Sequence, residues 1–343
     1  MKVSARKSRV IALGLLMSAA LVTTACGNSS NDTDGGTSSE SSGTSYPEKQ
    51  IDIVVPFSAG GPTDTVTRLV ADPMGKDLGQ TIVVKNVPGP GGTVGTREVA
   101  NADPDGYTLL LYHIGMSTTP RLYENKNLGY DPLTDFAPVG LVTNVPMTII
   151  TRKDLGVTDL QGLIDYLKEN PDATYGHAGI GSASNLCGTL FKKDAGVEFR
   201  AIPQEGTAEV KKNLLGGKID FSCDQTTNTS EIIASGDVTA LAVTTPERVD
   251  TPALKDIPTA QEEGLDMDLS IWHALYAPAG TPDDVISVLQ DALKKSLADE
   301  NVISKFGELG TAPVPDDQVS PEAVTTLLTD QIAQWNELLE PIE

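Results

Sequence analysis

Two loops combine glycine with hydroxyl side chains, and each lies between a predicted strand and a predicted helix. The first runs from Ser58 to Asp64 and the second from Gly176 to Asn185. Glycine lets a backbone approach a ligand closely, and a helix N-terminus offers free N–H groups with a partial positive charge. Such loops can hold an anion without a basic side chain. A plain strand-to-helix turn is the alternative for either loop alone, but two loops of one design favour a binding cleft.

Sequence motifs of common cofactor sites are incomplete. Gly89 and Gly91 begin a dinucleotide-binding pattern, but its third glycine would fall on Val94. Gly217-Lys218 lacks the earlier glycine that a phosphate-binding loop requires. We therefore expect no cofactor.

Groups that could act in catalysis are scattered along the chain. His113, His177 and His273 each lie near a predicted strand end, but they show no metal-ligand spacing, so separate polar or packing roles are favoured over a metal site. The nucleophile pattern Gly-x-Ser-x-Gly is missing. A binding protein is therefore favoured over an enzyme. The alternative from another class is a surface hydrolase that uses Ser182 or Ser184.

Alternating strands and helices must position these loops. An apolar strand at 51–55 leads into the first loop, and Pro62 suits the first position of the following helix. Pro73 should kink or end that helix, because an interior proline costs about 3 kcal/mol. Further strands are expected at 81–84 and 108–112, separated by a glycine-rich turn at 88–95 and a short helix to about Ala102.

The second half of the chain repeats this alternation. Thr158 and Gln161 form a capping box before a helix with an apolar stripe, and Pro171 ends it. Strands are expected at 147–151, 173–177, 198–202, 219–223 and 239–244, and helices at 184–195, 206–216, 281–299 and from 320 onward. This order predicts an α/β fold whose parallel sheet is covered by helices on both faces.

Composition and charge exclude several classes of protein. The chain has 343 residues, a length that favours one large or two medium domains, and 39% of them are hydrophobic. Its one membrane-like apolar run lies at the N-terminus, so a multi-span membrane protein is excluded. The formal charge of −22 would repel phosphate backbones, so we expect no nucleic-acid partner.

The N-terminal segment is interpreted as a secretion signal. Four basic residues precede the apolar stretch from Val10 to Val22, and small residues follow before Cys26. A cysteine at this point resembles the lipobox of bacterial lipoproteins, with Thr23 in place of the usual leucine. We therefore expect residues 1–26 to be a signal peptide with a lipobox-like end, at which Cys26 becomes the lipidated first residue. Ordinary secretion, with Cys26 incidental, is the alternative.

The segment after Cys26 is expected to be a flexible tether. Residues 27–45 contain no apolar side chain and are mostly serine, glycine, threonine, asparagine and aspartate. Nineteen residues of this composition have a root-mean-square reach of roughly 25 Å. That reach suits a domain held just off the outer face of a cell membrane.

Cys187 and Cys223 remain in the folded region, and neither belongs to a Cys-x-x-Cys motif. In an exported protein the two could form a disulfide. Two small buried thiols are the equal alternative, and the spacing does not decide between them.

Several ordered segments resemble one known family. They include Pro56-Phe57-Ser58-Ala59-Gly60-Gly61-Pro62-Thr63-Asp64 and Asp103-Pro104-Asp105-Gly106-Tyr107. Shorter matching segments are residues 86–92, 130–139, 215–220, 241–244, 256–259 and 272–282. Together they resemble the Bug family, the solute receptors of tripartite tricarboxylate transporters, over about residues 46–340.

The resemblance implies a two-lobed, type II-like periplasmic-binding-protein fold of the α/β class. Each lobe is then a sheet flanked by helices. The ligand cleft then lies between lobe 1, residues 46–145 plus 271–343, and lobe 2, residues 146–270. The crossing segments near 142–150 and 268–276 would form the hinge. Carried over to this chain, the candidate ligand-binding residues are Phe57, Ala59, Gly61, Asp64, His113, Ala178, Gly179, Ser182, Ser184, Thr207 and Asp224.

The resemblance also implies a function. The chain would be an extracytoplasmic, lipid-anchored and monomeric receptor of a tripartite tricarboxylate-type transporter. It would capture a small organic carboxylate, which is a monocarboxylate, a dicarboxylate or an amino-acid-like compound, and deliver it to a membrane permease. A ligand sensor for a signalling system is the alternative within binding proteins.

One departure from the family pattern and one residue that follows it bear on the ligand. Gln204-Glu205 replaces the family's Tyr-Lys, which removes a positive charge near the cleft. Asp224 would face the far end of the ligand, where it could accept from an ammonium or hydroxyl, although an ordinary exposed loop carboxylate is an equal alternative. Glu205 and Asp224 together disfavour a tricarboxylate and favour a monocarboxylate or an amino-acid-like ligand.

Overall fold

The computed structural model describes residues 45–342, which form one compact unit. The predicted signal peptide, the lipidation site Cys26 and all of the predicted tether except Ser45 lie outside the described residues. The strands are β1 (Ile51–Val55), β2 (Ile82–Asn86), β3 (Thr108–His113), β4 (Phe136–Arg152), β5 (Thr174–His177), β6 (Arg200–Pro203), β7 (Phe221–Gln225), β8 (Val238–Val243) and β9 (Ser270–Pro278).

Helices alternate with most of these strands. They are α1 (Pro62–Leu78), α2 (Thr93–Ala100), α3 (Gly115–Leu122), α4 (Leu160–Glu169), α5 (Ala183–Ala195), α6 (Thr207–Leu215), α7 (Thr226–Ala234), α8 (Asp283–Leu297), α9 (Glu300–Glu308) and α10 (Pro321–Leu338). Short 3-10 turns lie at η1 (Pro90–Gly92), η2 (Lys153–Leu155) and η3 (Asp316–Gln318). Within residues 45–342, no helix has the length and apolar character needed to cross a bilayer.

The strands form one mixed sheet with two distinguishable halves. Its order is β2-β1-β3-β9-β4-β7-β5-β6, and β8 pairs with β4 outside this path. In the first sheet half β1 is parallel to β2 and β3, and in the second β5 is parallel to β6 and β7. The antiparallel strands β4 and β9 lie between these two parallel groups.

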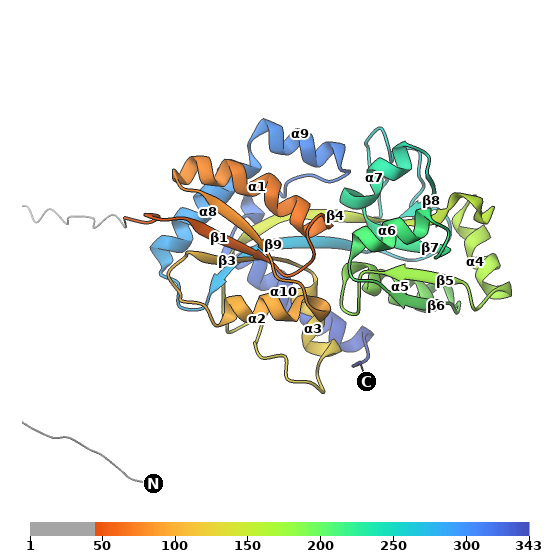
Figure 1. Ribbon diagram of the computed structural model, residues 1–343, viewed down its shortest axis with the longest axis horizontal. Helices are drawn as coiled ribbons and strands as arrows, with labels where there is room; N and C mark the ends of the chain where they lie inside the picture. The colour runs from red at the N-terminus through yellow and green to blue at the C-terminus, as the bar shows by residue number, and fades with distance from the viewer. Residues whose placement is uncertain (1–44, 343) are drawn as a thin grey trace, which may run out of the picture. The chain divides into compact units, whose positions relative to one another are not determined.

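Strand β4 belongs to both halves. Its residues from Phe136 to Pro146 pair with β9, and those from Met147 onward pair with β7 and β8. Figure 1 shows β4 and β9 running side by side from one half into the other. The two halves are therefore joined by continuous backbone rather than by a loose linker.

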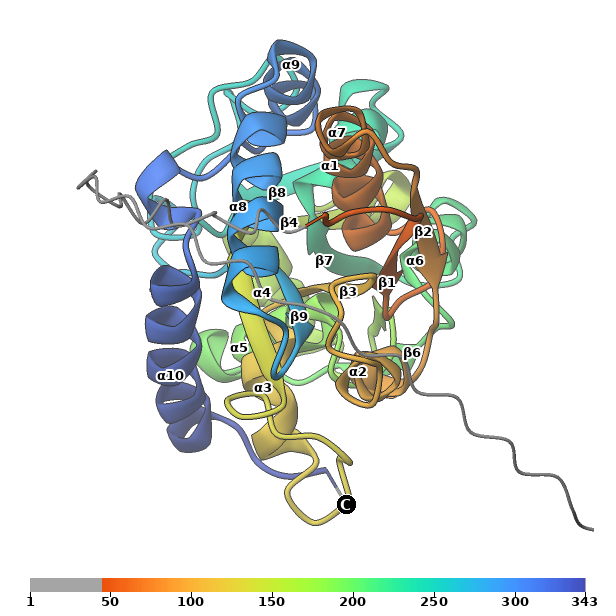
Figure 2. The same ribbon diagram turned by 90° about the vertical axis from the view of Figure 1, so that its left-hand side faces the viewer.

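Helices cover both faces of the sheet. In the first half α1 and α8 pack together on one face, and α10 packs on α3 and β4 (Figure 2). In the second half α5 and α6 both contact β5 and β7. The predicted α/β class with a helix-covered sheet is confirmed, with the addition of the antiparallel β4 and β9.

Two local predictions need correction. Helix α1 does not end at Pro73 but continues to Leu78, with Val66, Val70 and Met74 fully buried on its inner face. Helix α4 is capped by Asp159, whose Oδ1 accepts from the Gly162 N–H at 2.7 Å, so Thr158 is not the cap.

Other elements were not predicted. Helices α3, α7 and α9 are short. Helix α3 contains Pro120 and α7 is rich in threonine, so the sequences of these two carry a weak helical signal. The predicted strand at 147–151 is only the last part of β4.

Candidate functional site

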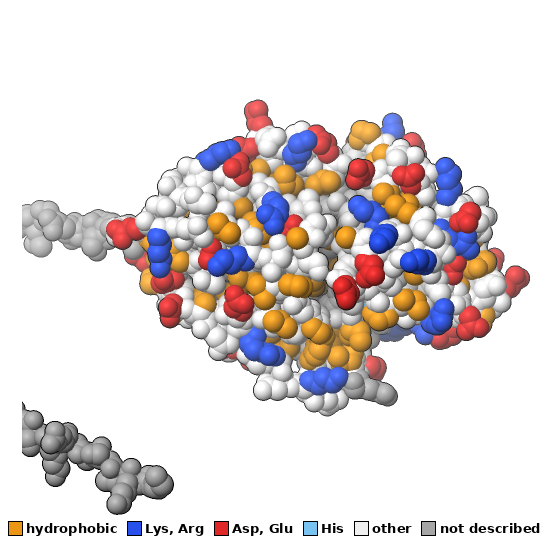
Figure 3. Space-filling model, in the orientation of Figure 1, with side chains coloured by type: hydrophobic (Ala, Val, Ile, Leu, Met, Phe, Trp, Pro, Cys, Tyr) orange, Lys and Arg blue, Asp and Glu red, His pale blue; other side chains and the backbone are white. Residues whose placement is uncertain are grey.

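A cavity of about 580 Å³ lies at the carboxyl ends of strands from both sheet halves. Residues just after β1, β5 and β6 line it, together with the terminal residues of β3 and β7. Ligands of open α/β sheets bind at such strand ends. Figure 3 shows acidic and hydrophobic side chains side by side on the molecular surface where the two halves meet.

The structure brings most of the predicted site residues to this cavity. Nine of the eleven line it: Phe57, Gly61, His113, Ala178, Gly179, Ser182, Ser184, Thr207 and Asp224. Ala59 and Asp64 do not line it. Ala59 is exposed, whereas Asp64 is buried behind the first loop.

Asp64 fixes the shape of the first loop from behind. Its Oδ2 accepts from the Gly60 N–H at 2.9 Å and from Arg68 Nε at 3.0 Å, and its Oδ1 accepts from Asn86 Nδ2 at 3.0 Å. Burial alone would raise the pKa of Asp64, but these hydrogen bonds and the Arg68 charge outweigh it and leave the pKa lowered. Asp64 therefore stays ionised and positions the loop rather than touching the cavity.

Asn86 extends this support to the aromatic wall of the cavity. Its Nδ2 also donates to the Phe57 carbonyl at 3.1 Å. The Phe57 ring stacks on His113, with ring centroids 4.6 Å apart. Residues from β2, β3 and the first loop thus hold one another in place.

The two buried histidines of the first half are neutral. The backbone N–H of Gly115 donates to His113 Nδ1 at 2.9 Å, so the ring proton of His113 lies on Nε2, which becomes its donor. His273 Nδ1 lies 3.1 Å from the Ile271 carbonyl and therefore donates to it, so Nε2 accepts from the Thr63 hydroxyl at 3.3 Å. Burial lowers the pKa of His273 to about 3, and burial together with His273 lowers the pKa of His113 well below its usual value.

The second loop is held by hydroxyl groups. Ser182 Oγ caps α5 by accepting from the Asn185 N–H at 3.1 Å, and Ser184 Oγ accepts from the Ala178 N–H at 2.9 Å. The two hydroxyls lie 3.1 Å apart and share one hydrogen bond. Since the pair has two hydroxyl protons and uses one between its members, one O–H donor remains for a ligand.

The N-termini of four helices surround the cavity. Lining residues include Gly61, the residue before α1, and Ser182, Gly206 and Gln225, the residues before α5, α6 and α7. No side chain caps α1, α6 or α7, so their first N–H groups are free of a competing side-chain acceptor. Four partial positive charges on one cavity favour an anionic ligand.

The ionisable charges in the cavity wall are acidic. Among the described lining residues Glu205 and Asp224 carry carboxylates, and none is lysine or arginine. Asp224 is 2% exposed; its Oδ1 accepts from the Gln225 N–H at 2.8 Å and its Oδ2 from Asn228 Nδ2 at 2.7 Å. Burial raises the pKa of Asp224 to about 6, against the opposing effect of these hydrogen bonds and of Lys211. Asp224 is therefore not the exposed loop carboxylate of the alternative interpretation.

Loops of the two halves touch across the cavity. Ser58 Oγ donates to the Glu205 carbonyl at 3.0 Å. A Cβ added to Gly181 would lie 2.8 Å from the Cα of Gly91, so this approach requires glycine, and Gly181 also has a positive φ of 82°.

Sequence reasoning missed part of the lining. Pro88, Gly89, Pro90 and Gly91 form one wall, and Ile180 another. The glycine-rich turn after β2 was the available signal, because it follows a strand that runs parallel to β1 and so ends at the same sheet edge.

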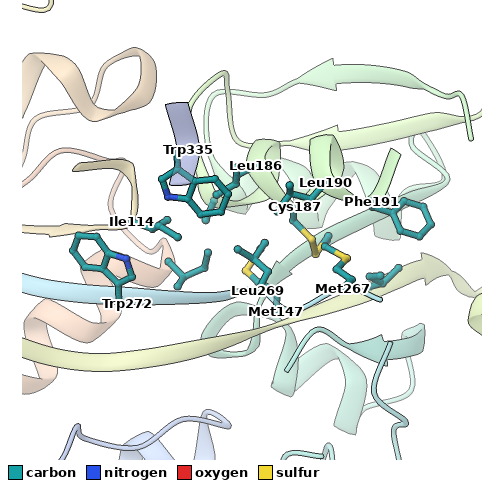
Figure 4. Packing of buried hydrophobic residues seen from close by; sticks show 14 of the residues in the cluster. Ile114, Met147, Leu186, Cys187, Leu190, Phe191, Met267, Leu269, Trp272 and Trp335 are labelled. Carbon is teal, nitrogen blue, oxygen red and sulfur yellow. A yellow bond between two sulfur atoms is a disulfide. The ribbon is translucent and has the colours of Figure 1, made fainter. Parts of the chain in front are cut away.

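A disulfide lies behind the second loop. It joins Cys187 of α5 to Cys223 of β7, which settles the alternatives left open by the spacing. Figure 4 shows Cys187 packed among Leu186, Leu190, Met147 and Met267. The bond ties the helix that begins at Ser182 to the strand that carries Asp224.

The described residues contain no group of three or more histidine, cysteine or acidic side chains able to hold a metal ion. The hydroxyls of Ser182 and Ser184 bond to each other and accept from backbone N–H groups of the second loop and of α5. The Ser184 carbonyl accepts from the Tyr175 hydroxyl.

Comparisons with known proteins agree with this architecture. Residues 66–343 match the family described as the tripartite tricarboxylate transporter family receptor. The UPF0065 protein in the TAR-I ttuE-ttuC' intergenic region of Agrobacterium vitis is 49% identical over 282 residues, which are 82% of this chain and 80% of that protein.

Solved structures give the same picture. The periplasmic binding protein BugD has a TM-score of 0.83 at 45% identity, covering 87% of this chain and all of BugD. MatC from Rhodopseudomonas palustris, solved with bound malate, has a TM-score of 0.82 at 34% identity, covering 86% of this chain and all of MatC. The chain therefore has the fold of the periplasmic binding proteins and belongs to the Bug family of extracytoplasmic solute receptors, the receptors of tripartite tricarboxylate transporters.

Proposed function

We propose that this chain captures a small organic carboxylate outside the cytoplasm and delivers it to a membrane permease. The observation that carries the proposal is a cavity of about 580 Å³ bordered by four helix N-termini. Neutral donors of this kind hold an anion by directed hydrogen bonds and helix dipoles. The bound malate of MatC supports the same ligand chemistry.

One ligand carboxylate is proposed to bind between the two glycine–hydroxyl loops. The first-half donors are the free N–H groups at the start of α1 and Nε2 of His113. The second-half donors are the spare hydroxyl proton of the Ser182–Ser184 pair and the free N–H groups at the start of α6. The far end of the ligand would lie toward Asp224, which favours a monocarboxylate or an amino-acid-like compound over a tricarboxylate.

Ligand binding is proposed to close two lobes, residues 46–145 with 271–343 and residues 146–270. The change of partners along β4, from β9 to β7 and β8, occurs between Pro146 and Met147 and supports this boundary. The hinge would be the crossing backbone near 142–150 and 268–276. The permease would recognise the closed form of a monomeric receptor.

Lipid anchoring at Cys26 is also proposed, and it rests on the N-terminal sequence alone. Mass spectrometry of the membrane fraction would detect a lipid-modified Cys26, and Cys26→Ser should release the protein into the medium or periplasm. A Cys26→Ser variant that stays with the membrane would contradict the anchor.

Thermal unfolding with a panel of ligands tests the proposed function. A soluble form that starts at Gly27, and so omits the proposed lipidation site Cys26, would be heated with mono-, di- and tricarboxylates, amino acids, neutral sugars and esters. A bound ligand at a hundred times its dissociation constant adds about 2.7 kcal/mol to the unfolding free energy. Stabilisation by carboxylates alone supports the receptor, whereas ester turnover abolished by Ser182→Ala would support a hydrolase. If carboxylates bind but transport in cells is unaffected by deletion of the gene, a sensor becomes the better assignment.

A further inference from the structure

The cavity holds one buried acidic group and no basic side chain to balance it. Asp224 lies at the end of β7 and lines the cavity, yet it is 2% exposed. Each carboxylate oxygen accepts one hydrogen bond from its own chain segment, Oδ1 from Gln225 and Oδ2 from Asn228. A carboxylate oxygen has room for a second partner, so Asp224 retains hydrogen-bonding capacity toward a ligand.

The chemistry at Asp224 depends on whether the carboxyl group carries a proton. The ionised form accepts only, and it suits an ammonium or hydroxyl on the ligand. The protonated form has an O–H donor and suits a second ligand carboxylate, which would otherwise be repelled inside a site of low dielectric constant. Gln225, 3% exposed with Oε1 lacking a hydrogen-bond partner, lies beside it at the cavity wall.

We propose that Asp224 selects the charge at the far end of the ligand. When ionised, it binds an ω-ammonium. After taking one proton from solvent, it keeps that proton and donates the O–H in a hydrogen bond to a second ligand carboxylate. This inference deepens the proposed carboxylate-binding function and rests on it. If Asp224 acts in this way, the protein binds one proton together with a dicarboxylate. It binds the amino analogue without a proton.

The surroundings of Asp224 leave it as the group that titrates. Lys211 of α6 contributes an attractive charge, and Tyr175 of β5 lies close enough for its pKa, already raised by burial, to be raised further by Asp224. His113 lines the same cavity, and His177 ends β5; burial lowers the pKa of both, so they remain neutral. Glu205, exposed at the cavity rim, is the remaining lining carboxylate. Burial raises the pKa of Asp224 to about 6, near enough to neutrality for a second ligand carboxylate to draw a proton onto it.

A matched pair of ligands separates the two forms. Succinate and β-alanine have the same two methylene groups and one common carboxylate, but the other end is a carboxylate in succinate and an ammonium in β-alanine. If the panel identifies a longer ligand, its dicarboxylate and ω-amino forms replace this pair. Isothermal titration in two buffers of different ionisation enthalpy gives the number of protons taken up with each ligand.

We expect the dicarboxylate to take up about one proton at pH 7.5 and its affinity to fall about tenfold per pH unit from pH 7 to 8. The amino analogue should take up none, and its affinity should fall below pH 6 instead. Asp224→Asn, which keeps the shape of the side chain, should remove proton uptake and the pH dependence for the dicarboxylate. Glu205→Gln is the matched control and should retain both.

The outcomes distinguish this inference from the proposed function. Dicarboxylate binding without proton uptake in the unaltered protein overturns the role of Asp224 while leaving the receptor intact. Proton uptake that persists in Asp224→Asn and disappears in Glu205→Gln moves the role to Glu205 and overturns the inference. If no carboxylate binds at all, the proposed function fails, and this inference fails with it. The buffer comparison on the unaltered protein does not depend on the variant folding.

Discussion

The two loops that face each other across the cavity are built differently. The first is held from behind by charge, through Asp64, Arg68 and Asn86, and none of these three lines the cavity. The second is held by the neutral hydroxyls of Ser182 and Ser184, which line the cavity themselves. In these two loops the charged side chains thus lie behind the cavity wall, and the side chains that line the cavity are neutral. An anion can then be bound without a fixed cation that would hold it too tightly for release.

The largest expected effect concerns the covalent support of the second loop. Replacing Cys187 and Cys223 by alanine removes a crosslink between residues 36 positions apart. The chain-entropy relation gives a loss of about 4 kcal/mol in the free energy of unfolding. Urea denaturation of the double variant measures it, with reductant-treated native protein as the comparison. A loss below about 1 kcal/mol would mean that packing around α5 holds the second loop without the disulfide.

Removing the charge behind the first loop should weaken all ligands alike. Asp64→Ala removes the acceptor of the Gly60 N–H and one of the two acceptors of Asn86 Nδ2, whereas Arg68, whose side chain is 52% exposed, is rehydrated. We expect the unfolding free energy to fall by about 2 kcal/mol. The affinity should fall by the same factor for every ligand. Arg68→Ala is the control, and it should cost less because Asp64 keeps its other two donors. A loss of affinity confined to one ligand class would place Asp64 in contact with the ligand after all.

The two halves should also respond to acid with opposite signs. His273 has a folded pKa of about 3, so between that value and the unfolded value near 6.5 the unfolded chain binds a proton that the folded chain does not. Stability therefore falls as the pH drops through this window, by about 1.4 kcal/mol per pH unit. Asp224 has a folded pKa of about 6, above its unfolded value near 3.9. Its contribution to the unfolding free energy therefore rises as the pH falls from about 6 to about 3.9.

Denaturation curves from pH 7 to pH 4 measure this balance. His273→Gln should flatten the loss of stability in acid, and Asp224→Asn should steepen it. If both variants change the slope in the same direction, the assignment of opposite contributions to the two halves is wrong.

The smallest expected effect concerns the contact between the two halves. Ser58→Ala removes the hydrogen bond to the Glu205 carbonyl, which is worth about 0.5–1.5 kcal/mol. We expect the affinity for every ligand to fall a few-fold, because this contact joins the two loops that enclose the cavity. Titration calorimetry checks this, with Ser45→Ala outside the cavity as the control. An unchanged affinity would show that the contact does not contribute to the ligand-bound state.

The sequence was sufficient for the positions of both glycine–hydroxyl loops, because each combines a strand end, glycine and a helix start within about ten residues. It was not sufficient for the roles of acidic residues. Asp64 and Arg68 are one helical turn apart, but which side of the loop they face depends on Asn86, 22 residues away from Asp64. Asp224 looks like a loop carboxylate in sequence, and its burial follows from the packing of β7 between β4 and β5.

Long strands were the other limit of sequence reasoning. Strand β4 contains two prolines and an exposed Asn144, so its 17 residues do not show one continuous alternation. The pairing with β9 supplies that continuity, and β9 lies more than 100 residues away in the chain.

The pairing of Pro146 with Ser270 has a consequence for how the chain folds. In the proposed division into two lobes, everything between these two residues leaves and re-enters the first lobe at one place, so the second lobe would be an insertion in a split domain. We expect the inserted segment to acquire structure as soon as it emerges from the secretion channel, whereas the first half must wait for β9, which is synthesised after it. Protease resistance of an isolated 147–269 fragment, compared with a fragment ending at residue 146, would test this order of folding during export.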